Sequence, residues 1–222
     1  MFGLDDVLAS YSDGAGLLVV ALVAIVLGFR HATDPDHLAA LTTLAPSEPA
    51  PGRAARLGVA WGAGHALTLS IFGLPVVLFN ALLPEAVQRG AETAVGVMIA
   101  ALAVWLLLRW RRGEFALHAH PAAHGARTAR QAFLVGLVHG VGGSAGVGVL
   151  LVATIDSRIY AVTALALLAV FTAVSMTVLT TAFGTAFARL GVGRAVPVLG
   201  AASLAFGVWY SLGALSLAPY YF

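Results

Sequence analysis

The chain has 222 residues, of which 60% are hydrophobic and only 10% are charged, and its mean hydropathy is +0.93. A soluble domain carries about 25% charged residues, so most of this protein's surface does not face water. The net charge of +2 is too small and too dispersed to indicate nucleic-acid binding. The sequence has no cysteine, which excludes disulfides, iron–sulfur ligation and thiol redox chemistry.

Six apolar segments, at about 16–44, 56–80, 92–110, 130–153, 159–188 and 196–217, approach the length that crosses about 30 Å of hydrocarbon. We therefore expect an all-α integral membrane protein of six transmembrane helices, forming a single domain over 1–222. The first segment follows an acidic stretch without a basic region or cleavage site, so we expect a retained helix and not a signal peptide. Proline inside this segment predicts that its helix is broken near Asp34-Pro35.

Arginine placement predicts the orientation in the membrane. Only Arg89 and Arg158 lie at one set of segment ends, whereas the alternate loops are rich in arginine. Those arginines are Arg53, Arg56, Arg109, Arg111, Arg112, Arg127, Arg130, Arg189 and Arg194. Basic loops stay in the cytoplasm, so both termini of this multi-pass protein are expected outside it, in the cell (inner) membrane.

The chain also repeats itself. The stretch Gly28 to His31 resembles Gly136 to His139, and the spacing from His65 to Gly73 recurs from Met176 to Gly184. A third match relates Gly96, Ala101, Val104 and Trp105 to Gly200, Ala205, Val208 and Trp209. We expect repeat A at about 16–110, a His-rich cytoplasmic loop at about 111–129, and repeat B at about 130–217. Because each repeat has three helices, the two would be inverted relative to one another, as is typical of transporters.

The first segment carries the polar stretch from Arg30 to His37. Each charged residue at a helix centre costs roughly 2.5–3.5 kcal/mol on the insertion scale, so these groups need partners. In a straight helix His31, Asp34 and His37 share one stripe, and Asp36 lies off it. A break at Pro35 could bring Asp36 round and expose the His31 carbonyl as a further ligand.

His37, His65 and His139 each lie about 8–9 residues from a cytoplasmic segment end, or roughly 12–14 Å deep. Imidazoles from three helices, with carboxylates beside one of them, predict a site for a divalent transition-metal ion. The competing interpretations are structural. A lone histidine inside a membrane often bonds helices together, and glycines such as Gly136 and Gly140 serve close packing as readily as an unwound stretch. Met176 is either a thioether ligand or a space-filling residue.

The loop after the third segment contains His118, His120 and His124. A His-rich cytoplasmic tract can capture metal, although a solvated loop without that role is an equal alternative.

Three motifs resemble the nickel/cobalt transporter family. His31-x4-Asp36-His37 after Arg30 is similar to its signature helix, and Trp61 to His65 is similar to its second, glycine-histidine motif. The stretch from His139 to Ser144 looks like the branch of urease-accessory nickel permeases. The resemblance implies that His31, Asp36 and His37 recognise the metal and that His65 assists. The larger members of the family have eight helices and later acidic motifs that this chain lacks.

We therefore expect a transporter, not an enzyme, that moves nickel or cobalt through the bilayer by alternating access. The metal would bind His31, Asp36, His37, His65 and His139, with Asp34 less firmly assigned, and no organic cofactor is expected. Two alternatives remain open. One is an exporter of a small organic ion that uses the histidines as a proton relay. The other is a membrane acyltransferase with a His31-x4-Asp36 dyad.

Ligand imidazoles must be neutral, which generates a pH prediction. Transport should fall steeply below about pH 6, because histidines protonate near their reference pKa of roughly 6.5. Uptake or efflux measured in vesicles between pH 5 and 8 tests this, and a flat profile would count against imidazole ligation.

Overall fold

The computed structural model describes residues 16–44, 50–79, 81, 83–115, 127–140, 142, 145–190 and 195–219, and within them it contains helices and no strand. In chain order the helices are α2 (Leu17–His31), α3 (Pro35–Leu44), α4 (Pro51–Phe79), α5 (Glu85–Arg111), α6 (Ala129–His139), α7 (Ala145–Ala153), α8 (Arg158–Leu190) and α9 (Val196–Ala214). Four of them, α4, α5, α8 and α9, are long and apolar enough to cross a membrane, and the bent pair α2–α3 adds a fifth if its two helices together form one broken span. The expected all-helical membrane class is confirmed, whereas the sixth span stays a prediction.

The break in the first segment is confirmed. Helices α2 and α3 differ in direction by 52°. The Thr33 amide donates to the Arg30 carbonyl at 2.8 Å and the Asp34 amide donates to the His31 carbonyl at 3.1 Å, so the chain turns before Pro35 starts α3. The His31 carbonyl, which such a break could expose as a further ligand, accepts this turn bond, and its role as a ligand stays a prediction.

The fourth segment is interrupted as well. The predicted single helix over 130–153 is two helices, α6 of 11 residues and α7 of 9. Helix α6 ends at His139, and Gly140 follows as a turn. The glycine-rich stretch therefore does break the helix, which was one of its two sequence interpretations.

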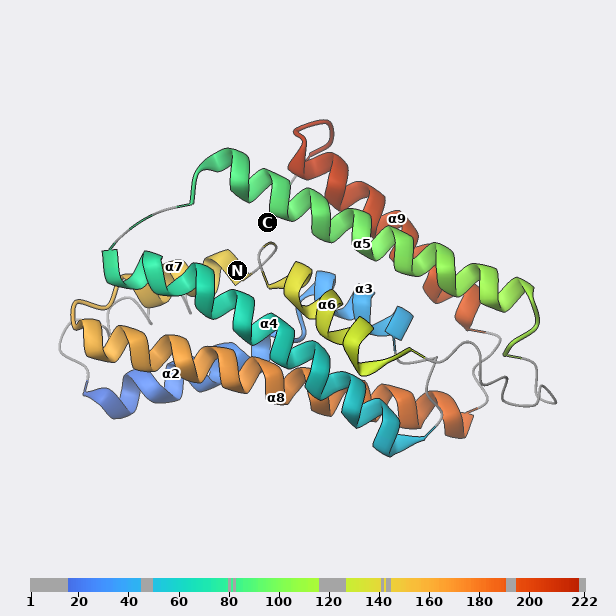
Figure 1. Ribbon diagram of the computed structural model, residues 1–222, viewed down its shortest axis with the longest axis horizontal. Coiled ribbons are helices and arrows are strands. Elements are labelled where there is room, and N and C mark those ends of the chain that lie inside the picture. Colours follow the sequence, from blue (N-terminus) through green and yellow to red (C-terminus); the bar gives the residue numbers. More distant parts are fainter. Residues whose placement is uncertain are drawn as a thin grey trace.

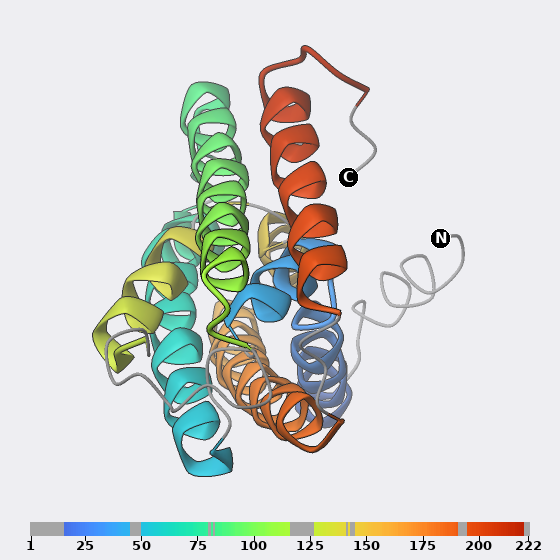
Figure 2. The same cartoon turned by 90° about the vertical axis from the view of Figure 1, so that its right-hand side faces the viewer.

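The helices form two groups that enclose α3. Figure 1 shows α5 and α9 lying side by side along the molecule, above a layer that contains α4, α8 and α2. Seen end-on in Figure 2, α6 covers the outer side of α4, and α3 lies between the two groups. Helix α3 contacts α5, α9 and α8. The short half-helix that carries the acidic motif is thus the centre of the bundle.

The outer surface is apolar. Large side chains such as Ile71, Val97, Ile159 and Val198 are more than half exposed although they lie on long helices. Exposed apolar surface of this extent indicates contact with lipid. Inside, one apolar cluster includes Trp61 and Ile99 and a second includes Leu69 and Leu165. His65 lies between Trp61 and Leu69 on α4, so the polar residues occupy the level between the two clusters.

Helices α4 and α6 meet backbone to backbone. A methyl group on Gly136 would overlap the carbonyl oxygen of Trp61, and one on Gly64 would overlap that of Phe133. A methyl group on Gly140 would lie 2.5 Å from the His65 carbonyl oxygen. Side chains larger than hydrogen would force these helices apart, so this glycine seam (Gly64, Gly136 and Gly140) fixes how closely α4 and α6 approach.

Replacing Gly136 tests the seam. We expect Gly136→Ala to destabilise the protein by about 1–3 kcal/mol, because the added methyl overpacks against a backbone that cannot yield. Gly90 on α5 faces open space and is the matched control. Gly90→Ala should raise stability by up to about 1 kcal/mol through helix propensity. Thermal unfolding of the purified variants measures both, and equal shifts would contradict the seam.

Candidate metal centre

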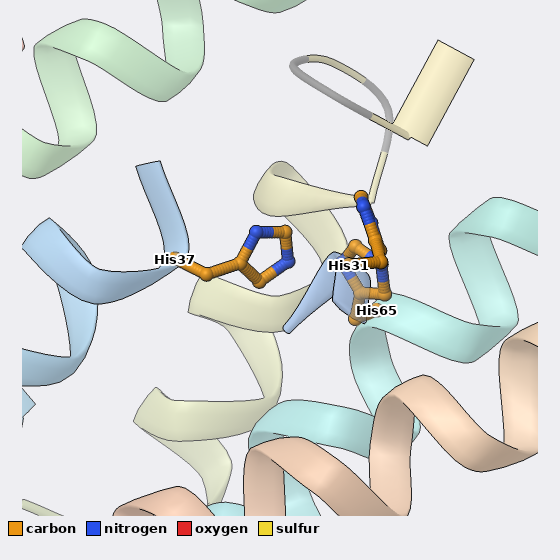
Figure 3. A group of neighbouring side chains, drawn as sticks. All are labelled: His31, His37 and His65. Carbon is orange, nitrogen blue, oxygen red and sulfur yellow. The ribbon is translucent and has the colours of Figure 1, made fainter. Parts of the chain in front are cut away.

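Four buried histidines meet at the ends of the broken helices. His31 is the last residue of α2, His37 lies in the first turn of α3, His65 lies within α4, and His139 is the last residue of α6. His31 is 7% exposed and the other three are at most 1% exposed. Their ring centroids lie 4.2 to 6.0 Å apart in the five measured pairs. Figure 3 shows His37 pointing from α3 toward His31 and His65. The residues that the sequence placed at one depth are therefore neighbours.

The turn before α3 decides which side chains face this histidine cluster (His31, His37, His65 and His139). Pro35 is the first residue of α3, where its missing amide hydrogen costs no helical bond. Asp36 follows in the first turn, where the positive end of the helix dipole favours a carboxylate. The change of direction also resets the helical phase. Asp36, which lies off the predicted stripe of a straight helix, consequently turns into the cluster.

The Asp36 carboxylate joins two of the imidazoles. His37 Nδ1 donates to Oδ1 at 3.2 Å, and His139 Nε2 donates to Oδ2 at 3.2 Å. Asp36 is only 2% exposed, so these bonds replace the water that the carboxylate has lost. An ionised carboxylate only accepts hydrogen bonds, so the two facing nitrogens carry the protons. The opposite nitrogens, His37 Nε2 and His139 Nδ1, are left with lone pairs.

Asp34 has a different place from the one expected. It was predicted between His31 and His37 on one stripe, but it lies at the edge of the cluster and is less buried than Asp36. His31 Nδ1 donates to Asp34 Oδ2 at 3.1 Å. This bond fixes the tautomer of His31 and directs its Nε2 lone pair inward. Asp34 thus orients a histidine.

The inward nitrogens have the spacing of neighbouring metal ligands. His31 Nε2 lies 3.3 Å from His65 Nε2. Two nitrogens bound to one ion at about 2.0–2.1 Å, at angles between octahedral and tetrahedral, lie about 2.8–3.4 Å apart. His37 completes a group in which His31, His37 and His65 each offer a nitrogen, all within 4.8 Å of one another. The arrangement can hold a cation of borderline softness.

Several buried nitrogens at the cluster have no hydrogen-bond partner among the residues that the structure describes: His37 Nε2, His65 Nδ1, His139 Nδ1 and Trp61 Nε1. The Trp61 ring lies 6.0 Å from that of His37 and 5.8 Å from that of His139, so it walls one side of the cluster. Sequence reasoning gave Trp61 no role of its own. Its position one turn before His65 on the same helix was the available signal.

Four residues that the sequence suggested as metal ligands do not belong to the histidine cluster as the structure describes it. His118, His120 and His124 lie beyond the described residues, so their capture of metal stays a prediction. Met176 is fully buried in the apolar cluster that contains Trp61, which favours its space-filling interpretation.

The chain is 28% identical over 153 residues to the urease accessory protein UreH of Bacillus sp. (strain TB-90), a match covering 65% of this chain and 67% of that protein. No family model matches the chain. No solved structure matches it either.

The contact between His31 and His65 generates a stability prediction. His31 Nε2 and His65 Nε2 share a buried hydrogen bond at 3.3 Å, so His65→Leu should lower the thermal midpoint of the metal-free protein, by about 0.5–1.5 kcal/mol of stability. Thr68, one turn further along α4, is the matched control, since its buried hydroxyl donates to the Gly64 carbonyl at 3.0 Å. Thr68→Val should lower the midpoint to a similar extent. A higher midpoint for His65→Leu would mean that its imidazole destabilises the empty bundle.

Proposed function

We propose that this chain transports divalent transition-metal ions, nickel or cobalt, across the membrane, and that the histidine cluster binds the ion in transit. The observation that carries the proposal is the convergence of imidazole nitrogens from α2, α3 and α4 within 4.8 Å of one another inside a lipid-facing bundle. Ionisable groups inside a membrane are costly, and those that are retained there usually mark the path of a substrate or an ion. A cluster of this size indicates a transported ion.

The donor set suits these metals. Neutral imidazole is a good ligand for nickel and cobalt, whereas sites for magnesium or calcium use oxygen. Asp34 and Asp36 each accept the Nδ1 hydrogen of a histidine, of His31 and His37 respectively. Carboxylates that hold a ligand imidazole in this way fix its tautomer and raise its basicity. Both roles are consistent with a preorganised site.

Close contacts between the two halves support the three-plus-three inverted repeat. In the repeat, His65 is equivalent to Met176, and the same offset makes Gly62 equivalent to Ala173. These two residues touch, because a methyl group on Gly62 would lie 2.8 Å from the Ala173 Cα. Two equivalent positions that touch each other are expected on a twofold axis.

The third helices of the halves meet in a reciprocal way. A methyl group on Gly96 would overlap the Ser211 hydroxyl, and one on Gly200 would lie 2.7 Å from Leu107 Cδ2. In the repeat, Gly96 is equivalent to Gly200, and the same offset makes Leu107 equivalent to Ser211. Each contact is therefore the counterpart of the other, as an inverted repeat requires.

The interruptions in the first and fourth segments agree with such a repeat. Each follows a histidine, His31 and His139, that the repeat makes equivalent. Discontinuous helices at the interface between repeats are where transporters bind their substrates, and rocking of one repeat against the other opens the site to each side in turn. The relative is a urease accessory protein, which agrees with the resemblance of the stretch after His139 to urease-accessory nickel permeases.

The geometry favours neither alternative function. In an acyltransferase dyad Asp36 would orient His31, but its carboxylate oxygens accept from His37 and His139. The cluster is also buried within the bundle. An exporter of organic ions would use the histidines to carry protons, and it would bind no metal.

Calorimetric titration of nickel, cobalt and zinc into the purified protein tests the proposal. The wild type should bind nickel or cobalt, and His37→Ala should bind at least about 100-fold more weakly, because His37 is one of the three imidazoles whose nitrogens converge. Met176→Leu, a buried control beside the cluster, should bind like the wild type. Unchanged affinity in His37→Ala would remove the site. Absence of metal binding in the wild type would instead favour the organic-ion exporter.

A further inference from the structure

The histidine cluster offers two sets of ligands. His31, His37 and His65 form one group with converging donor atoms, and Asp36, His37 and His139 form another. In each group one atom per residue lies within 4.8 Å of the others, and all five residues are buried. The groups share His37 alone.

The position of His37 explains the sharing. Its ring centroid lies 4.5 Å from that of His31, 5.0 Å from that of His65 and 4.2 Å from that of His139. The centroids of His65 and His139 are 6.0 Å apart, so His37 is the nearer neighbour of each. It is also carried by α3, whose first turn follows the break, whereas His65 and His139 are carried by α4 and α6. His37 therefore stands between two sets of partners on different helices.

The two groups also differ in chemistry. The first offers three imidazoles, and the second offers two imidazoles and a carboxylate. In the second group each oxygen of the carboxylate already accepts a hydrogen bond from an imidazole, from His37 or from His139, and each keeps a further lone pair that can bind a cation.

From this overlap we propose that the cluster holds two alternative positions for the transported ion, which the ion occupies in succession while it keeps His37 as a ligand. The inference rests on the proposed transport function and adds a step within it. Two divalent ions a few ångströms apart repel strongly, and one imidazole cannot serve both, so the positions exclude each other. Because both groups contain His37, the ion can pass between them without leaving the cluster, and neither position need bind it so tightly that it is not released.

Three matched glutamine variants separate the positions. His65→Gln affects only the first group, His139→Gln affects only the second, and His37→Gln affects both. Glutamine can still donate to Asp36 at position 139, so the bundle keeps a partner for that carboxylate. Equilibrium dialysis of nickel against each purified variant gives affinity and stoichiometry. Flux of nickel into vesicles that contain the protein gives transport, and thermal unfolding identifies any variant that fails to fold.

We expect one nickel ion per chain in the wild type, in His65→Gln and in His139→Gln, with affinity within about tenfold of the wild type because one position survives. His37→Gln should lose at least about 100-fold in affinity. Transport should fall at least about tenfold in both single-position variants, since each interrupts the succession. X-ray absorption should count three imidazoles on nickel in His139→Gln and fewer in His65→Gln.

Two results would overturn the inference while leaving the transport function intact. If either single-position variant lost affinity as severely as His37→Gln, the donors would form a single site. If His139→Gln bound and transported nickel like the wild type, His139 would serve only to hold Asp36. A wild type that neither binds nor transports nickel or cobalt would refute the proposed function itself.

Discussion

The structure depends on placing one carboxylate in the middle of a lipid-facing bundle. Asp36 has lost nearly all its water, so it must receive hydrogen bonds from the protein, and it receives them from His37 and His139. Because His139 is the last residue of α6, its bond to Asp36 joins the end of α6 to the start of α3. The helix dipole of α3 contributes because the carboxylate stands at its positive end. The turn at 32–34, the short length of α3 and its central position all serve this arrangement.

Much of the fold could be predicted from sequence because its signals are local. Hydropathy located the long helices to within a few residues, except that α4 and α5 begin earlier than their apolar segments, because their first turns contain charged residues such as Arg53 and Glu85. Proline located the break in the first segment. Counting residues from the segment ends predicted that His37, His65 and His139 lie at one depth. This count is valid because the chain between each segment end and its histidine is regular helix.

The details of the site could not be predicted, because they depend on what happens after the chain turns. The helical periodicity of a straight helix placed Asp34 between His31 and His37, and it does not hold across the turn at 32–34. Only the break expected at Pro35 indicated that Asp36 could face the histidines. The glycines around His139 were equally consistent with packing and unwinding, and the structure uses them for both: Gly136 packs against α4, while Gly140 begins the interruption. Sequence alone does not say which helix lies opposite a given glycine, and so the neighbour of His139 could not be named.

The glycine seam between α4 and α6 has a consequence for how such a protein could change its metal. Main-chain contact sets the separation of His65 and His139, and it does so whatever side chains those two positions carry. A substitution at either position would change the hardness or the charge of the metal-binding atom and leave the backbone of α4 and α6 in place. Related proteins could then differ in the cation they select through single substitutions, without a change in the helix packing.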